Sequence, residues 1–180
     1  MGKIEGFTHL YADRLERKDN PLIVFRGKLD TLCAMIMEAQ LLGESLGNAG
    51  FSGDLQEILD FTRSILPAEF RGEPMGEFVL LGLTHGDLRE RSRNPARYFR
   101  HGHLFMDKSM GALCLRLNLL RTFTRETELA AVTAFRDTGG KKESLRPDII
   151  EALNALSSLF YVLTYKYLPE GYTQKGDAGI

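Results

Sequence analysis

Three charged side chains in the second half of the sequence have the types and spacing to bind an anion. Arg121, Arg125 and Glu128 follow one another at i, i+4 and i+7, which places them along one narrow stripe of an α-helix. Leucines point in most other directions, which predicts a helix that is buried or covered at a subunit interface. Two arginines and one glutamate leave excess positive charge there, and buried charge needs a partner. The stripe is therefore either a structural ion-pair network or an anion site.

Other polar residues could serve the same chemistry, although each also has a structural interpretation. Asp30 lies in the first turn of an apolar predicted helix, where it either pairs with the arginines or favours the helix dipole. Five arginines between residues 89 and 100 form either a solvated surface or the rim of an anion pocket. His101 and His103 make only half of a metal site, so we predict no metal centre. A polar stripe on the last predicted helix consists of Asn154, Ser158, Tyr161 and Tyr165. Asn154 either contacts a ligand or satisfies a neighbouring backbone group.

Composition limits which anion is expected. The 180 residues carry 23 basic and 24 acidic side chains, so the chain lacks the overall positive field that drives binding to nucleic acid or an anionic membrane. No apolar stretch approaches the ~20 residues of a membrane span. P-loop, dinucleotide-binding and HExxH motifs are absent from the sequence, and no Ser/His/Asp set is indicated by a local signature, so we expect that the nucleophile of any reaction is not a side chain. Cys33 and Cys114 are the only cysteines, which is typical of a reducing cytoplasm.

The elements that must position these residues are helices. Apolar periodicity and capping signals predict five of them, at about 27–46, 54–66, 84–93, 107–137 and 145–168. Gly47 and Pro67 are expected to end the first two, and Thr84 with Asp87 forms a predicted capping box. The fold class is therefore all-α, a five-helix bundle. We expect an irregular N-terminal lead (1–26), the helical-bundle domain (27–168) and a disordered tail (169–180).

Two segments resemble a known family. The run LLRTFTRETE at 119–128 and the run LRPDIIEALNALSS at 145–158 resemble the ethanolamine-utilisation branch of the ATP:corrinoid adenosyltransferases. Shorter stretches at 8–10, 25–30, 82–84 and 94–104 agree in order. The resemblance implies a five-helix bundle of the cobalamin adenosyltransferase type. Such an enzyme transfers the 5′-deoxyadenosyl group of ATP to the cobalt of reduced cobalamin and forms adenosylcobalamin.

The resemblance also implies roles for individual residues. The residues it assigns to catalysis are Arg121, Arg125, Glu128 and Asp30. The residues it assigns to ATP are Arg121, Arg125, Glu128, Asn154, Thr8, His9, Arg26 and Lys28. Arg121 is expected to pair with Asp30 across a subunit interface, and Thr8 and His9 stand near where the propanediol-utilisation type has a glycine-rich phosphate loop. The residues it assigns to the corrinoid are Phe105, Phe99 and His103, with Phe105 against the lower face of the corrin.

The implied substrates are ATP with Mg²⁺ and cob(I)alamin or cob(II)alamin, and the implied assembly is a homotrimer with intersubunit active sites. Cob(I)alamin is itself the nucleophile in this chemistry, which agrees with the missing nucleophile motifs. Full-length members of this branch carry a metal-binding N-terminal extension, and we expect the sequence to begin about where it would end. We expect a cytoplasmic protein, with association with a bacterial microcompartment left open. The alternative function is a non-catalytic corrinoid- or nucleotide-binding bundle that delivers cofactor to a partner enzyme.

Overall fold

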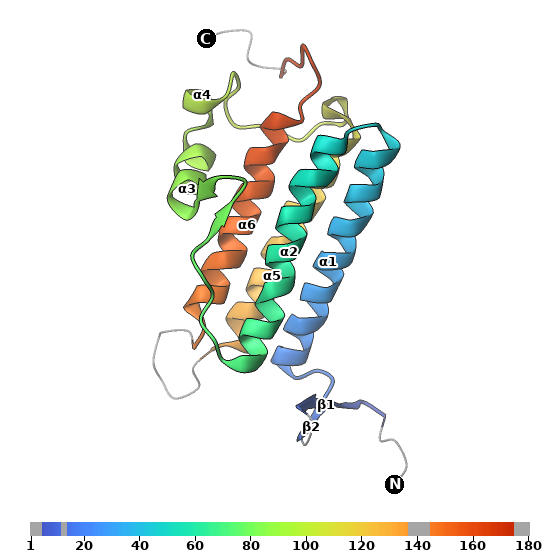
Figure 1. Ribbon diagram of the computed structural model, residues 1–180, viewed down its shortest axis with the longest axis vertical. Coiled ribbons are helices and arrows are strands. Elements are labelled where there is room, and N and C mark those ends of the chain that lie inside the picture. The colour runs from blue at the N-terminus through green and yellow to red at the C-terminus, as the bar shows by residue number, and fades with distance from the viewer. Residues whose placement is uncertain (1–4, 12–13, 137–144, 175–180) are drawn as a thin grey trace.

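The computed structural model describes residues 5–11, 14–136 and 145–174 and confirms the all-α class. Four long helices form the bundle in Figure 1: α1 (Pro21–Ser45), α2 (Ala49–Arg71), α5 (Gly111–Ala134) and α6 (Pro147–Lys166). The shorter α3 (His85–Arg93) packs against α6. All five predicted helices are therefore present. The described residues also contain a one-turn helix, α4 (Pro95–Tyr98), and the 3-10 helix η1 (Lys108–Met110).

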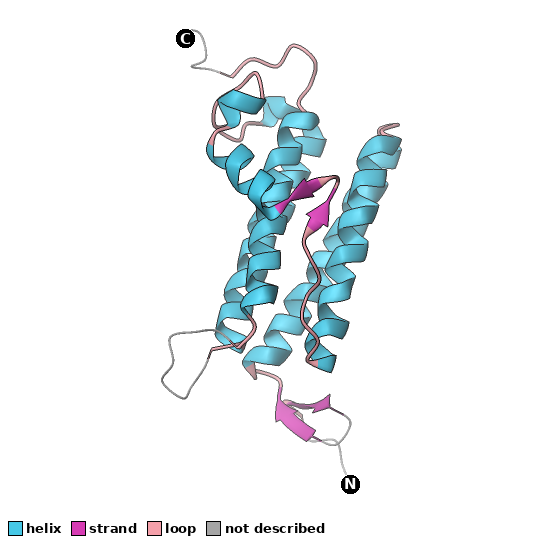
Figure 2. Ribbon diagram, turned by 60° about the vertical axis from the view of Figure 1, so that its left-hand side comes forward, coloured by secondary structure: helices cyan, strands magenta, loops and turns pink. Residues whose placement is uncertain are grey.

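Two small antiparallel sheets were not expected from the sequence (Figure 2). Strand β1 (Phe7–Tyr11) pairs with β2 (Arg14–Arg17) before α1, and β3 (Val79–Leu80) pairs with β4 (Leu83–Thr84) before α3. Strands this short carry too little period-two alternation to be recognised. The turn between β3 and β4 holds both Leu81 (φ 52°) and Gly82 (φ 70°) in the left-handed region. The backbone N–H of Leu81 donates to the Glu57 carboxylate on α2.

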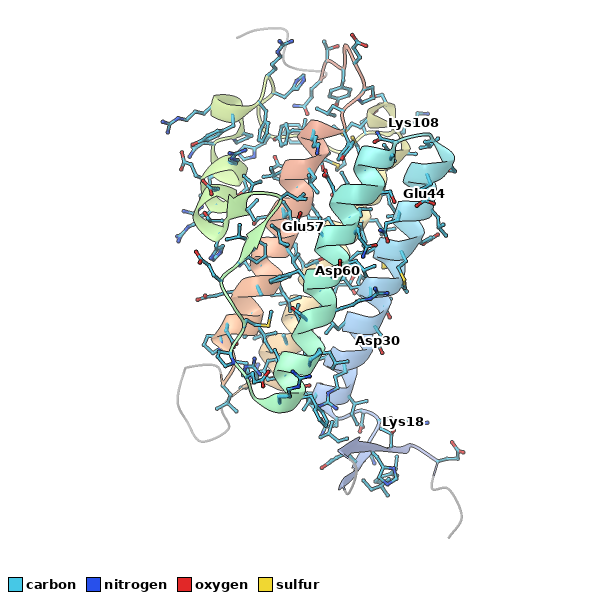
Figure 3. The ribbon with its side chains drawn as sticks, in the orientation of Figure 1. Lys18, Asp30, Glu44, Glu57, Asp60 and Lys108 are labelled. Atoms are coloured by element: carbon cyan, nitrogen blue, oxygen red, sulfur yellow. The ribbon has the colours of Figure 1, made fainter. Side chains whose placement is uncertain are left out.

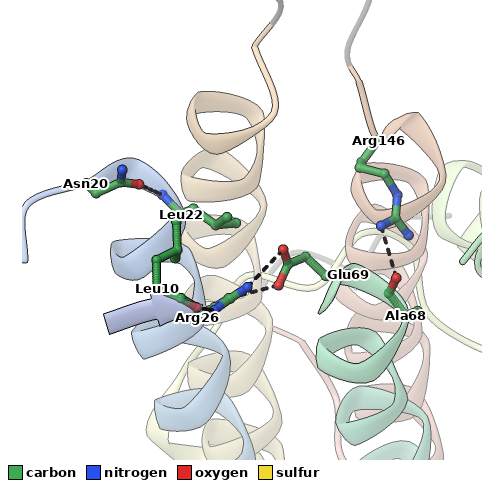
Figure 4. Close-up of polar contacts among 7 residues, drawn as sticks. All are labelled: Leu10, Asn20, Leu22, Arg26, Ala68, Glu69 and Arg146. Carbon is green, nitrogen blue, oxygen red and sulfur yellow. Dashed lines mark hydrogen bonds and ion pairs between the residues drawn. The ribbon is translucent and has the colours of Figure 1, made fainter. Parts of the chain in front are cut away.

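Helix α1 begins at Pro21, so the predicted start near Gly27 is wrong. The side chain of Asn20 accepts a hydrogen bond from the backbone N–H of Leu22 at 2.9 Å (Figure 4), and Pro21 occupies the first helical position. Both are standard helix-start signals, because the cap satisfies a free N–H and proline has none to satisfy. The expected irregular lead therefore contains the β1–β2 hairpin and the first turn of α1.

Helix α2 is longer at both ends than the predicted 54–66. The Asn48 side chain caps it by accepting from the N–H of Phe51 at 3.0 Å. Pro67 lies inside the helix and does not end it; Gly72, at φ 68°, follows its last residue as the left-handed C-cap. Arg146 donates to the backbone carbonyl of Ala68 at 3.2 Å (Figure 4). The same carbonyl accepts from the backbone N–H groups of Gly72 and Glu73 at the C-cap, so Arg146 adds a side-chain contact to an end that the backbone already closes.

The ends of the last two helices also differ slightly from prediction. Helix α5 starts at Gly111, whose φ of 80° separates it from the 3-10 turn at Lys108–Met110. The predicted end of this helix at residue 137 lies outside the described residues. Helix α6 begins at Pro147 and ends at Lys166, so it is two residues shorter at each end than the predicted 145–168. Part of the tail expected to be disordered, residues 169–174, is described and contacts the 103–105 loop, and residues 175–180 lie outside the described part.

One apolar core joins the long helices. Helix α1 packs against α2 and α5, and α5 packs against α6; the largest fully buried side chains include Phe25, Phe51 and Phe160. The sequence predicts that the α5 segment is buried or covered at a subunit interface, and in the single chain Leu115, Leu119 and Leu129 are exposed. Burial within one chain is therefore wrong, and cover at an interface stays a prediction. Among the described helices, none combines the length and apolar character that a membrane span requires.

Candidate functional site

The charged stripe of Arg121, Arg125 and Glu128 lies on α5, and α5 packs against α6. Arg121 and Glu128 are half-buried and Arg125 is exposed. The guanidinium of Arg121 donates through Nε to the side-chain oxygen of Asn118, one turn earlier, at 3.1 Å. Among the described residues, neither Arg121 nor Arg125 forms an ion pair with a carboxylate, and Glu128 forms none with a cationic side chain. The stripe is therefore not a closed ion-pair network within the described part of the chain.

The charged groups of the stripe are partly removed from solvent without full compensation by partners. Burial lowers the pKa of Arg121, the neighbouring Arg125 lowers it further, and Tyr161 of α6 acts in the opposite direction. Burial raises the pKa of Glu128, and Arg125 only partly opposes that shift. Desolvation disfavours the charged form of both groups. A site with two arginines, one glutamate and incomplete solvation is suited to an anion that brings its own negative charge.

The face of α6 next to this stripe carries Asn154, which is exposed, and two tyrosines near the C-terminal end of the helix. The hydroxyls of Tyr161 and Tyr165 lie 2.8 Å apart. Tyr165 donates to the backbone carbonyl of Gly102 at 2.8 Å, and the N–H of Leu104 donates to the Tyr161 hydroxyl at 3.3 Å. Both tyrosines were expected on a polar stripe, but no role was predicted for either. Their hydrogen-bond partners in the loop are about 60 residues away in the sequence, so local spacing does not reveal them.

The three residues expected to contact the corrinoid come together at this end of α6. Phe99 stacks on the Tyr165 ring with centroids 4.2 Å apart. Nδ1 of His103 lies 3.1 Å from the Tyr161 hydroxyl. Phe105 is 75% exposed, although its backbone N–H is held by the side-chain oxygen of Gln174 at 2.9 Å. An aromatic side chain so exposed on an anchored backbone is a candidate contact for an apolar ligand surface.

Two of the predicted ATP-binding cations have partners within the chain. Arg26 contacts both carboxylate oxygens of the buried Glu69, at 2.8 and 3.2 Å, and donates to the carbonyl of Leu10 in β1 at 2.8 Å (Figure 4). Lys28 pairs with Glu126 of α5 at 3.1 Å. Arg26 thus ties β1, which carries the half-buried Thr8 and the exposed His9, to α1 and α2. The buried Glu69 was not recognised from the sequence, where it lies in a segment expected to be a loop.

Asp30 lies apart from the stripe within one chain. It is exposed on α1 (Figure 3) and lines an open cavity of about 510 Å³ together with Leu66, Pro67 and Phe70 on the α1–α2 side. Arg121 hydrogen-bonds to Asn118 within α5 and does not line this cavity. The structure therefore forms no Asp30–Arg121 pair within the described single chain, and the expected pairing across an interface stays a prediction.

The arginine-rich segment at 89–100 forms an exposed surface on α3 and α4. Arg97 pairs with Glu90 at 3.2 Å, and the guanidinium of Arg91 lies 5.5 Å from the centroid of the Tyr98 ring. These contacts are typical of a solvated surface. No group of three or more His, Cys, Asp or Glu side chains is arranged to hold a metal ion anywhere in residues 5–11, 14–136 and 145–174.

Comparison of sequences confirms the predicted resemblance. Residues 99–167 match the family model described as cobalamin adenosyltransferase. The chain is 38% identical over 162 residues to the corrinoid adenosyltransferase EutT of Escherichia coli K12, and 37% identical over the same length to EutT of Salmonella typhimurium. These alignments cover 89% of this chain and 58% of the relatives. The chain therefore spans less than two thirds of the length of the curated relatives it matches.

Comparison of structures supports the fold. The chain resembles a single-residue, arginine-to-lysine variant of a PduO-type ATP:co(I)rrinoid adenosyltransferase from Lactobacillus reuteri, solved in complex with ATP. The TM-score is 0.66, with 18% sequence identity, and the match covers 90% of this chain and 89% of the other. The likeness shows that the two proteins share a fold. The region matched by the family model contains seven of the expected site residues: Phe99, His103, Phe105, Arg121, Arg125, Glu128 and Asn154.

Proposed function

We propose that this chain is a corrinoid adenosyltransferase that transfers the 5′-deoxyadenosyl group of ATP to the cobalt of reduced cobalamin. The observation that carries the proposal is the half-buried Arg121 beside Arg125, with no carboxylate paired to either among the described residues. Two adjacent guanidinium groups, of which that of Arg121 is partly desolvated, favour a polyphosphate, because arginine binds phosphate oxygens through several donors at once. The sequence similarity to corrinoid adenosyltransferases supports the same assignment.

The reaction requires little covalent chemistry from the protein. The electron pair of cob(I)alamin attacks the ribose C5′ of ATP, a cobalt–carbon bond forms, and the C5′–O bond breaks with its electrons leaving on the triphosphate. Arg121 and Arg125 would bind the triphosphate and stabilise its growing charge. Glu128 and Asn154 would fix the nucleotide through hydrogen bonds and align C5′ with the cobalt. Mg²⁺ would enter with ATP as part of the substrate.

The corrinoid would bind at the C-terminal end of α6, where the loop with Phe99, His103 and Phe105 lies. Phe105 is exposed and aromatic, so it can cover an apolar face of the corrin and displace the lower ligand of cob(II)alamin. Removing that ligand makes the cobalt easier to reduce, which is the step before nucleophilic attack. The cavity of about 230 Å³ between Phe105, Tyr172 and Gln174 leaves room beside the ring for this contact.

The proposed assembly is a homotrimer in which each active site uses two subunits. Asp30 and the β1 residues Thr8 and His9 would face the Arg121 stripe of a neighbouring copy. The exposed leucines of α5 support such an interface, because a single chain leaves them uncovered. The free thiols of Cys33 and Cys114 support a cytoplasmic location.

An anaerobic assay with ATP, a strong reductant and cobalamin tests the activity directly. We expect the absorbance spectrum of adenosylcobalamin to appear in proportion to enzyme and time. Binding of both ligands without product would instead favour a non-catalytic bundle that delivers cofactor to a partner. Failure to bind either ligand would overturn both functions.

Arg125→Ala tests the anion site. ATP at 100 times its Kd should stabilise the wild-type chain by about 2.7 kcal/mol, seen as a rise in Tm of several degrees. The variant should lose this rise, because a guanidinium that binds phosphate is missing. The matched control is Arg136→Ala, which removes an exposed arginine just beyond α5 and should keep the full ATP effect. An unchanged rise in the Arg125→Ala variant would remove Arg125 from the site.

A further inference from the structure

We propose that Tyr161 is a positioning residue of the corrinoid half-site, whose hydroxyl fixes the backbone of residues 102–105 and so sets how Phe105 is presented. The inference rests on the proposed function, since it concerns the same site. Tyr161 is on α6, whereas the loop precedes α5. A contact between them therefore joins the loop to a helix that is largely buried in the bundle.

The Tyr161 hydroxyl has three polar partners. It lies 2.8 Å from the Tyr165 hydroxyl, 3.1 Å from Nδ1 of His103 and 3.3 Å from the backbone nitrogen of Leu104. A hydroxyl donates one hydrogen bond and accepts two. Its capacity is therefore fully used within the protein, and two of its three partners belong to the loop.

A single arrangement of protons satisfies every contact. Tyr165 must donate to Gly102, because a backbone carbonyl can only accept. Tyr161 then donates to Tyr165, since otherwise two oxygens without a proton between them would face each other at 2.8 Å. The N–H of Leu104 and Nδ1–H of His103 both donate to Tyr161. The result is a directed chain from Leu104 through Tyr161 and Tyr165 to the carbonyl of Gly102.

This chain of hydrogen bonds holds three consecutive loop residues from one side. Gly102 is bound through its carbonyl, His103 through its ring and Leu104 through its N–H. Groups of α6 therefore fix the loop at three successive residues before any substrate is present.

The position of Tyr161 links the two halves of the proposed site. The loop residue Leu104, which donates to Tyr161, is followed directly by the exposed Phe105. Beside it on α5 lies Arg121, whose charge Tyr161 influences. Fixing the loop before the substrate arrives reduces the conformational entropy lost on binding, and side chains held by such surrounding contacts are placed more accurately. Loss of the hydroxyl should accordingly weaken corrinoid binding while leaving the arginines in place.

The decisive variant is Tyr161→Phe, which removes one oxygen and keeps the ring. We expect the KM for the corrinoid to rise about tenfold, because two loop donors lose their acceptor, while the KM for ATP stays within about twofold. Tyr165→Phe should give a similar loss, and the double variant should lose no more than the larger single effect, since the hydroxyls act as one chain. The matched control is Tyr167→Phe. This hydroxyl, near the same end of α6, donates to Asp54 at 2.7 Å, and among the described residues it forms no hydrogen bond to residues 102–105.

Spectroscopy of bound cob(II)alamin measures the fraction that has lost its lower ligand. A variant that only lowers the stability of the protein should leave this fraction unchanged. The Tyr161→Phe protein should hold a smaller fraction of cob(II)alamin without its lower ligand, whereas the Tyr167→Phe protein should match wild type. Equal changes in the two KM values, or equal effects of Tyr161→Phe and Tyr167→Phe, would overturn the inference. The Kd for cob(II)alamin, measured without ATP, gives the same comparison without turnover. An inactive wild type would therefore overturn the proposed function and still leave Tyr161 tested.

Discussion

At the scale of single residues, this chain uses arginine in two opposite ways. Arg26 is paired with the buried Glu69 and a strand carbonyl, so its charge is satisfied inside the chain. Arg121 is half-buried with only an amide oxygen as its partner in α5. The sequence could not separate the two, because Glu69 is 43 positions from Arg26 and only the folded chain brings them together. A helical stripe, in contrast, follows from local spacing alone, and the placement of Arg121, Arg125 and Glu128 on one face could be predicted.

Glu128 provides a prediction about pH. Burial raises the pKa of this carboxyl in the folded chain, so ionising it costs more in the folded than in the unfolded state. The cost is absent below the ordinary glutamate pKa of about 4.3 and is fully present once the pH exceeds the folded pKa. Glu128→Gln should therefore increase the free energy of unfolding at pH 7 by about 0.5 kcal/mol, a small gain because solvent screens a half-buried group. The gain should vanish below about pH 4.

Urea denaturation of the ligand-free protein across pH 3–8 measures this effect. The control is Glu126→Gln, two residues away on the same helix, where the carboxylate pairs with Lys28 and its removal should be neutral or slightly destabilising. The same Glu128→Gln protein should lose adenosyltransferase activity, since the carboxylate is proposed to contact ATP. A Glu128→Gln protein less stable than wild type at pH 7 would contradict the direction of the pKa shift.

At the scale of elements, the start of α6 is joined to the end of α2 by one arginine. Arg146 donates to the carbonyls of Ala68 and Glu73, at 3.2 and 2.8 Å, and binds Asp148 through two nitrogens at 3.0 Å. The N–H of Met75 donates to the same carboxylate at 2.8 Å. Arg146 and Asp148 belong to the run that carries the family resemblance, yet in the structure both organise a helix junction.

Arg146→Lys tests this structural role. An ammonium cannot reproduce the planar fork that reaches two carbonyls and a carboxylate, so we expect the free energy of unfolding to fall by about 2 kcal/mol. The Kd for ATP of the folded protein should stay unchanged. Chemical denaturation and ATP titration at low temperature separate the two quantities. Arg93→Lys, an exposed arginine on α3, is the control and should change stability by less than about 0.5 kcal/mol. A large loss of ATP affinity in Arg146→Lys would instead place Arg146 in the site.

The helices themselves were predictable because their signals are local. The Thr84–Asp87 capping box is present, with the N–H of Asp87 donating to Thr84 at 3.2 Å. The errors at the helix ends lay in the choice among local signals, because Asn20 with Pro21 starts α1 and Asn48 caps α2, both ahead of the predicted starts. Pro67 was expected to end α2, but the described chain continues to Arg71, where Gly72 takes the left-handed conformation. The hairpins were missed because such short strands are defined by pairing with each other and not by pattern.

At the scale of the whole molecule, the exposed apolar residues of α5 predict that the chain does not act alone. Leu129 is 66% exposed and lines a cavity of about 450 Å³ with Val24, Lys28 and Glu126 between α1 and α5. Leu129→Glu places a charge on this surface and should convert the proposed trimer into monomers at micromolar concentration. Sedimentation or light scattering measures the mass. The matched control is Leu145→Glu, equally exposed at 66% and located just before α6.

Activity should follow assembly if the site is shared between subunits. The Leu129→Glu monomer should form no adenosylcobalamin although its Arg121 stripe is intact, whereas the Leu145→Glu protein should remain assembled and active. A monomeric protein with full activity would confine the site to one chain. The assignment of residues 27–168 as the adenosyltransferase domain stays a prediction.

The β3–β4 turn restricts how this sequence can change over evolutionary time. Leu81 has a positive φ, which favours glycine or asparagine, yet its side chain packs against the core and its N–H is bound by Glu57. Substitution by asparagine would relieve the backbone and empty the apolar space, and substitution by valine or isoleucine would fill the space and strain the backbone. Drift at position 81 should therefore be slow unless the residues packed around it change together.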